Sequence, residues 1–150
     1  MRSSLPTLLM AVLLALPWPA QAQFARLNDA VKYRQAGFHV LSTHVQRAGA
    51  MAKGDVAFDK AAAEANAALI ELLSRQLAGA FPPGSDMAPS KAKPEVWQDV
   101  AQFKTHTDQW QGAAAKLSGA ARSGDAIAFK TAFNALAQTC KSCHDGYRNR

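Results

Sequence analysis

Proline is missing from most of this chain, and its absence is the strongest constraint on the fold. Beyond residue 22 there are four prolines, and all of them fall between positions 82 and 94. The stretches on either side are rich in alanine, which accounts for 28 of the 128 residues in 23–150. Proline breaks helices, whereas alanine is the best helix former. The sequence therefore predicts long helices on both sides of one proline-rich connection.

Apolar side chains recur at alternating steps of three and four residues, the pattern of amphipathic helices. The predicted helices span 28–52, 57–80, 94–119 and 126–148. Asn28 or Asp29 is expected to cap the first helix, and Asp125 the last. Pro94 suits the first turn of the third helix, and Gly119 its end. No run alternates with a period of two, so we predict an all-α, antiparallel up-down-up-down four-helix bundle.

The predicted seams determine which residues meet at each end of such a bundle. They comprise Val31, Arg34, Phe38 and Leu41 in the first helix, Ala62, Asn66, Leu69, Leu73 and Leu77 in the second, Val96, Val100, Phe103, Thr107 and Trp110 in the third, and Phe129, Phe133, Leu136, Cys140 and Cys143 in the fourth. In an up-down bundle the end of the fourth helix lies beside the start of the first, the end of the second and the start of the third.

Residues 1–22 have the order of a secretory signal peptide. Arg2 provides a positive start, an apolar run follows from Leu8 to Leu16, and the segment closes on Ala20-Gln21-Ala22. The run is too short to span a bilayer, which takes about 20 residues. We predict that residues 1–22 are cleaved, that residues 23–150 form one domain, and that the mature protein is exported to the periplasm without a membrane anchor.

Composition excludes several other classes of protein. The chain is 49% hydrophobic and 19% charged, which is not the balance of a disordered tail. Its two cysteines are too few for a disulfide scaffold. Residues 23–150 carry 16 basic and 11 acidic side chains, and the charge of +5 is spread along the chain. No basic patch with interleaved aromatic residues predicts nucleic-acid binding, while acidic protein partners stay possible.

The chemistry of the sequence is concentrated at Cys140-Lys141-Ser142-Cys143-His144. On a helix the two cysteines share one face, and His144 lies one turn from Cys140. C-x-x-C-H is the attachment signal of c-type haem, in which two thioether bonds hold the haem and the adjacent imidazole binds its iron. Three alternatives are a redox dithiol, a zinc site and a plain structural disulfide. A redox pair belongs at a helix N-terminus, and a structural zinc site needs two further ligands.

With these features the chain resembles the cytochrome c′ family, class II c-type cytochromes that form four-helix bundles. The resemblance is carried by the segments 29–35, 93–97 and 140–148. It implies one covalently bound haem c held by Cys140 and Cys143, with His144 as the axial iron ligand. It also implies a homodimer built through the first two helices.

The resemblance also assigns roles to residues around the haem. Arg34 and Gln35 match positions that contact the propionates, and Arg148 matches an arginine beside the proximal histidine. Arg34 is also a charge within an apolar seam, which a snorkelling side chain would otherwise explain. Phe38 occupies the distal position, where cytochromes c′ place a residue that does not bind iron.

No residue is well placed in the sequence to be a sixth iron ligand. Met51 is about 20 Å along the first helix from Phe38, and His44 about 9 Å. His39 is expected to point outward, and His106 to flank its seam. Met87, in the proline-rich loop, is the remaining candidate. We therefore expect five-coordinate, high-spin iron with an apolar distal pocket.

An apolar pocket favours NO and CO, which depend less than dioxygen on a distal hydrogen-bond donor. The predicted function is reversible binding of these gases, with electron transfer to a redox protein as a second role. The alternative is a six-coordinate, low-spin electron-transfer cytochrome of class II. An enzyme such as a peroxidase is not expected, because no distal histidine or acid is placed to act.

Overall fold

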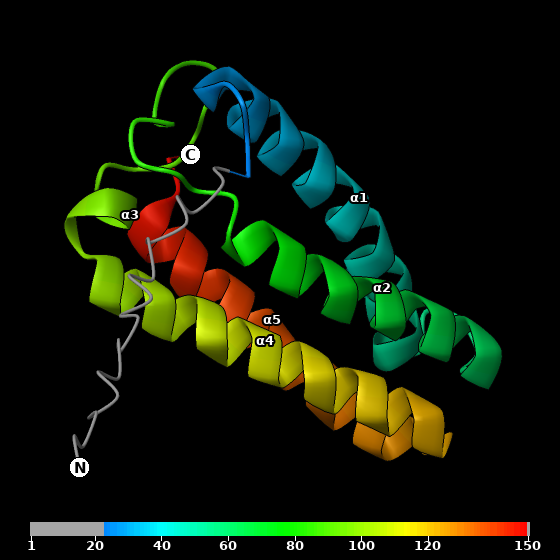
Figure 1. The fold of residues 1–150 in the computed structure, drawn as a ribbon. Coiled ribbons are helices and arrows are strands. Elements are labelled where there is room, and N and C mark those ends of the chain that lie inside the picture. Colours follow the sequence, from blue (N-terminus) through cyan, green and yellow to red (C-terminus); the bar gives the residue numbers. More distant parts are fainter. Residues whose placement is uncertain (1–22, 150) are drawn as a thin grey trace, which may run out of the picture.

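The computed structural model describes residues 23–149, and the predicted signal peptide at 1–22 lies outside these residues. The described chain forms α1 (Leu27–Lys53), α2 (Lys60–Ala78), α3 (Glu95–Gln98), α4 (Val100–Ser123) and α5 (Ala126–Tyr147). The four long helices form an antiparallel bundle, with α3 as a single turn before α4 (Figure 1). Within 23–149 no strand forms beyond one isolated bridge, between Ala92 and Arg148. The prediction of an all-α four-helix bundle is confirmed.

Each long helix packs against two others. The contacting pairs are α1 with α2, α2 with α4, α4 with α5, and α5 with α1, so α1 and α4 lie on one diagonal of the bundle. In the half of the bundle that holds the α4–α5 turn, these faces enclose the core. Its largest fully buried side chains include Ile70, Leu117 and Phe129. No helix in the described part of the chain is long and apolar enough to cross a membrane.

Helix ends follow local capping chemistry, and several differ from the prediction. The Asp125 carboxylate accepts hydrogen bonds from two backbone N–H groups of α5, so this predicted cap is confirmed. α1 instead begins at Leu27, with Asp29 in its first turn and paired to Arg26. Gly119 lies inside α4, which continues to Gly124 because that glycine adopts the left-handed conformation (φ 74°) that ends a helix.

The predicted third helix is interrupted. Asp99, at φ −117° and ψ 62°, separates α3 from α4, and its carboxylate accepts a hydrogen bond from the Gln102 N–H at the start of α4. The break turns Val100 outward, so this residue is 63% exposed although the prediction placed it on the seam. Val96, on the other side of the break, is buried as predicted.

The seam of α2 is rotated by about one residue from the prediction. Ala62 and Leu69 are exposed, whereas Ala63, Ala67 and Ile70 are fully buried. Small alanine side chains on this face let the backbone of α2 approach its neighbours closely, and Leu69 and Leu72 then lie at the edge of the contact. Asn66 and Leu77 are buried as predicted.

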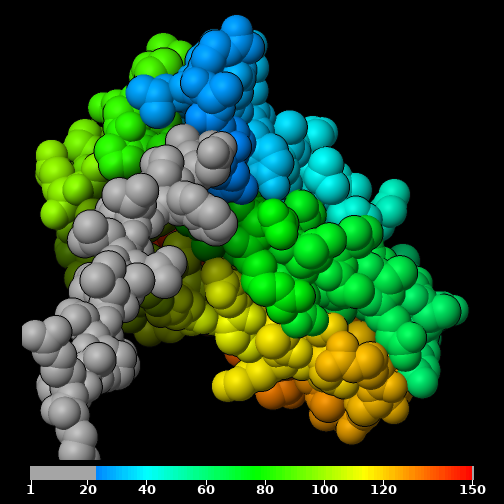
Figure 2. Space-filling view, viewed as in Figure 1, coloured from blue at the N-terminus to red at the C-terminus, as the bar shows by residue number. Residues whose placement is uncertain are grey.

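The segment between α2 and α3 closes one end of the bundle. Figure 2 shows this segment and the start of α1 together at one end of the molecule, away from the α4–α5 turn. The segment is tied to the end of α5, because Lys93 N–H donates to Tyr147 O and Asn149 N–H donates to Lys91 O. The prediction is confirmed that the start of the first helix, the end of the second, the start of the third and the end of the fourth meet at one end of the bundle.

Candidate haem site

A cavity of about 610 Å³ opens at this end of the bundle, lined mainly by α1, α4, α5 and the segment before α3, with Ala78 of α2 and Val96 of α3 at its wall. Most of its lining is apolar, with Val31, Phe38, Leu41, Val96, Phe103 and Trp110 among the contributing side chains. Its volume and apolar character fall in the range of sites for small molecules and cofactors. Leu41 and Trp110 of this lining also belong to the hydrophobic core, so the cavity directly adjoins that core.

Cys140, Cys143 and His144 all line the cavity from α5. Helical spacing brings the two thiols onto the face turned toward α1 and α4, where both are half-buried. Burial raises the pKa of each thiol. A reactive redox dithiol needs the opposite shift, so this alternative loses support. Within residues 23–149 no group of three or more His, Cys, Asp or Glu side chains could hold a metal ion, which also weakens the zinc alternative.

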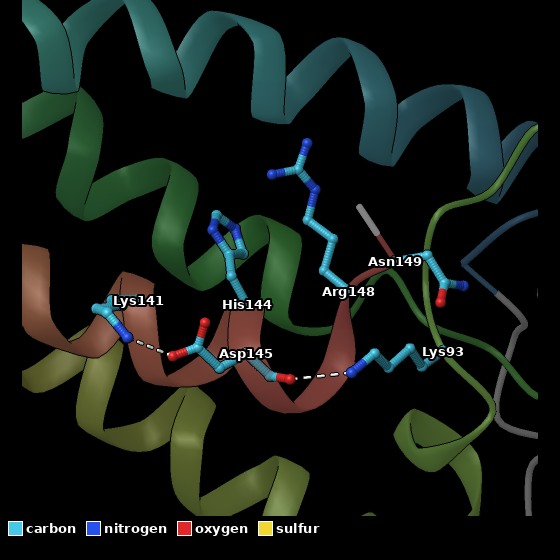
Figure 3. A pocket seen from close by; sticks show the side chains of 6 residues that line it. All are labelled: Lys93, Lys141, His144, Asp145, Arg148 and Asn149. Atoms are coloured by element: carbon cyan, nitrogen blue, oxygen red, sulfur yellow. Dashed lines mark hydrogen bonds and ion pairs between the residues drawn. The ribbon is translucent and has the colours of Figure 1, made fainter.

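The surroundings of His144 favour the neutral form of its imidazole. Partial burial of the ring, and then the charge of Arg148, lower the pKa of His144. A neutral imidazole has a free ring nitrogen, the form that binds a metal. Figure 3 shows His144 and Arg148 extending from α5 on the same side, toward α1. The structure thus brings Arg148 and His144 together on one side of α5.

A second, open depression of about 590 Å³ adjoins the cavity and shares His144 and Arg148 with it (Figure 3). Lys93, Lys141 and Asp145 form its other side. Lys141 Nζ lies 2.6 Å from Asp145 Oδ2, and Lys93 Nζ donates to the backbone carbonyl of Asp145 at 2.9 Å. The Lys141 contact lies within α5, whereas the Lys93 contact joins α5 to the segment before α3.

Arg34 and Gln35 reach the cavity from α1, and both have partners within the chain. Arg34 is 4% exposed, and its guanidinium donates to Ala80, Ser85 and Ser90. Gln35 Nε2 donates to Pro89 O at 2.9 Å. Burial lowers the pKa of Arg34, and no carboxylate pairs with it among the described residues. Sequence reasoning missed these loop partners, since Ser85 and Ser90 read only as polar turn residues.

Phe38 lines the cavity from α1 and stacks on Trp110 of α4. Trp110 is nearly buried, and its indole Nε1 has no hydrogen-bond partner in the described chain. Tyr147 continues the aromatic lining, with its ring against Phe103 and His106. This region of the cavity is therefore built mainly of rings, and the indole N–H of Trp110 is an unpartnered donor among them.

The structure separates the candidates for a sixth ligand. His44 is hydrogen-bonded to Asn66, Met51 is packed in the core, and Met87 is 39% exposed and outside the cavity lining. The expectation for His39 needs correction, because this exposed residue also lines the cavity. It follows Phe38 on α1, where the cavity is wide enough for residues flanking the seam to reach its edge.

The cavity fits a large apolar group that carries negative charge at its edge. Arg34, Lys91 and Arg148 contribute three cations to the lining, and no described Asp or Glu side chain joins them. A buried guanidinium without a carboxylate favours an anionic ligand. Haem matches this donor set, since two thiols, an imidazole and cations for the propionates lie around one apolar space.

The bundle, together with its Cys-x-x-Cys-His segment at a cavity, is consistent with the class of c-type haem proteins. Comparison with known proteins then identifies the family. The sequence model of the family described as Cytochrome C′ matches residues 29–148. This chain belongs to the cytochrome c′ family.

Individual relatives agree over nearly the whole described chain. Cytochrome c′ of Rubrivivax gelatinosus is 39% identical over 129 residues, covering 85% of this chain and 100% of that protein. Its crystal structure superposes with a TM-score of 0.81, over the same shares of the two chains. A nitric oxide complex of a variant of the Alcaligenes xylosoxidans protein is 38% identical, covers 85% of this chain and 100% of that one, and has a TM-score of 0.80. A carbon monoxide-bound variant of the same protein has the same identity, coverage and TM-score.

Proposed function

We propose that residues 23–150 form a periplasmic c-type haem protein that binds NO and CO at a five-coordinate, high-spin iron. The observation that carries the proposal is the cavity, in which α5 presents two thiols and an imidazole while α1 presents Phe38. Export to the periplasm rests on the signal peptide predicted at residues 1–22.

Each predicted site residue has a role in this proposal. Cys140 and Cys143 hold one haem c through thioether bonds, and His144 is the axial ligand. When bound, the haem supplies an iron with one coordination position for a diatomic ligand. Arg34 and Gln35 are directed to the propionates. The terminal nitrogens of Arg34 donate to the loop. The guanidinium has a further N–H, at Nε, that can donate to a propionate.

Phe38 and Arg148 account for ligand choice on the two sides of the haem. A mainly apolar distal side offers bound dioxygen little hydrogen bonding, and NO and CO lose less from that. The NO and CO complexes of variants of the Alcaligenes xylosoxidans protein support this choice of ligands. The ring of Phe38 crowds distal entry, which favours binding of NO on the proximal side, near Arg148.

His39 favours one alternative, the six-coordinate, low-spin electron-transfer cytochrome. Among the described lining residues, His39 and His144 are the two histidines, and there is no methionine. To reach the iron, His39 would have to pass Phe38, which is held against Trp110. We therefore keep electron transfer to an acidic redox protein as a second role of the five-coordinate protein. A catalytic role is disfavoured because the described lining has no carboxylate to act as an acid or base.

We further propose a homodimer formed through α1 and α2. Tyr33, Val40, Leu69 and Leu72 are large apolar side chains on these two helices, each more than a third exposed. Scattered apolar residues are normal on surfaces, so the proposal rests mainly on membership of the family. Sedimentation of the haem-loaded protein over a range of concentrations tests it, and a monomer at all of them contradicts it.

The proposed function is tested by the absorption spectrum of protein matured in a periplasm that attaches haem c. We expect a high-spin ferric spectrum and, after reduction, a spectrum that shifts when CO is added. A low-spin spectrum indifferent to CO would contradict five-coordination. In that case the spectra of His39→Ala and Met87→Ala identify the sixth ligand, because the variant that lacks this ligand would return to the high-spin form.

A further inference from the structure

The segment 79–94 forms one wall of the cavity although it has no regular secondary structure. Phe81, Pro89, Ser90, Lys91 and Ala92 line the cavity from this segment. A wall of this kind keeps its shape only where its backbone and side chains are held by other elements. Lys93 and Lys91 tie its end to α5, while the indole N–H of Trp97 reaches the carbonyls near its start.

The segment is also held from α1, mainly by the side chain of Arg34. Arg34 Nη1 donates to Ala80 O at 2.9 Å and to Ser85 Oγ at 2.6 Å. Arg34 Nη2 donates to Ser85 O and, at 3.2 Å, to Ser90 Oγ. The guanidinium also lies over the ring of Phe81, 4.6 Å from its centroid.

The geometry of these contacts is specific to arginine. The planar fork of the guanidinium reaches acceptors from Ala80 to Ser90, ten positions apart in the chain. The ammonium group of a lysine is a single point and cannot reach all of them at once. Ser85 is fully buried, and its hydroxyl donates in turn to Pro82 O at 2.8 Å. Gln35, the next residue on α1, adds a bond to Pro89 O.

We propose that Arg34 is a positioning residue that clamps segment 79–94 against α1 and thereby controls how ligands reach the haem cavity. The effect on ligand entry rests on the proposed function, whereas the clamp itself does not. The role is distinct from a propionate contact, since it acts through Ser85 and Ser90. Loss of either side of the clamp lets the wall move away from α1 and widens the cavity mouth.

The test uses the haem-loaded protein and four variants: Arg34→Gln, Arg34→Lys, Ser85→Ala and the Arg34→Gln/Ser85→Ala double variant. Hydrogen exchange is measured at the amides of Ser85, Ser90 and Asn149, and CO association is measured by flash photolysis. We expect Arg34→Gln to speed exchange at these amides about tenfold and CO association several-fold. Ser85→Ala removes one of the four contacts, the bond from Arg34 Nη1 to Ser85 Oγ, so it should act in the same direction but less strongly. Because Arg34→Gln already removes that bond, the double variant should add little to it, and Arg34→Lys should rescue neither readout.

Arg26→Gln is the matched control, because it removes the same charge next to α1 from a residue that contacts only Asp29 among the described partners. It should leave both measurements unchanged. Amides of the α4–α5 half report whether each variant is folded. The proposal is wrong if Ser85→Ala leaves exchange and CO association unaltered while Arg34→Gln changes only the reduction potential, since Arg34 would then act on the haem alone. If neither the haem-loaded wild type nor any variant binds CO, the proposed function fails. The exchange data still decide whether the clamp exists.

Discussion

Phe38 of α1 stacks on Trp110 of α4, with ring centroids 6.0 Å apart and planes inclined by 20°. The two helices lie on a diagonal of the bundle, so this stack reaches across the haem cavity that both residues line. A phenylalanine cannot bind iron, and the proposed function assigns its ring to the distal side, where it would obstruct an entering ligand.

Phe38→Ala should therefore speed CO association with the reduced protein, by about tenfold if the ring is the main obstacle to entry. Flash photolysis measures the rate. Phe58→Ala is the matched control, because Phe58 is also half-buried and packs edge-on against Phe129, outside the cavity lining. Unchanged CO affinity and rate in Phe38→Ala would show that this residue is not the gate.

Gly37→Ala should destabilise the protein by about 1–3 kcal/mol, in spite of the better helix propensity of alanine. A Cβ at this position would lie 2.5 Å from Leu77 Cδ2, and Leu77 is fully buried and has little room to move. Gly112→Ala is the control, since no atom lies within 4 Å of its Cβ position. Urea unfolding should show a gain of up to about 1 kcal/mol for Gly112→Ala. Equal effects of the two substitutions would contradict the close approach of α1 and α2.

Cys140→Ala and Cys143→Ala should each leave haem attached through one thioether bond. One vinyl group then stays conjugated with the ring, so the haemochrome band in alkaline pyridine should move to longer wavelength in both variants. The double variant should lose its haem on acid–acetone extraction. Haem that resists extraction from the double variant would rule out these cysteines as the attachment points.

Glu71 makes a pH-dependent contribution to stability. Its hydrogen bonds with Arg75 and then Ser118 hold the pKa of Glu71 below its ordinary value. A lowered folded-state pKa means that the stabilisation is present above the unfolded value and is lost as pH falls through the folded one. Glu71→Gln should cost about 0.5 kcal/mol near neutral pH and nothing once Glu71 is protonated in both states.

Urea titrations at pH 7 and at the lowest pH where the wild type still folds measure this difference. Glu64→Gln removes another carboxylate of α2, whose contact with Lys60 is longer, at 3.5 Å. It should cost less than Glu71→Gln at neutral pH. A penalty for Glu71→Gln that does not change with pH would contradict the assigned role.

The class of fold and the attachment motif could both be predicted from the order of residues. Alanine-rich segments with a helical period, and prolines confined to 82–94, leave few alternatives to a bundle. Cys140, Cys143 and His144 are close in the chain, so helical geometry alone brings them onto one face. The Asp125 cap was predictable for the same reason, because all its partners lie within three residues.

Features that depend on contacts between distant segments could not be predicted and are known from the tertiary structure. The break at Asp99, the rotated seam of α2 and the place of His39 at the cavity follow from how whole helices pack. The partners of Arg34 are 46 to 56 residues away in the chain, and they lie in a loop without a period that sequence could reveal. Local propensity acts over a few residues, whereas the walls of the haem cavity are built from all four long helices and the loop that closes one end.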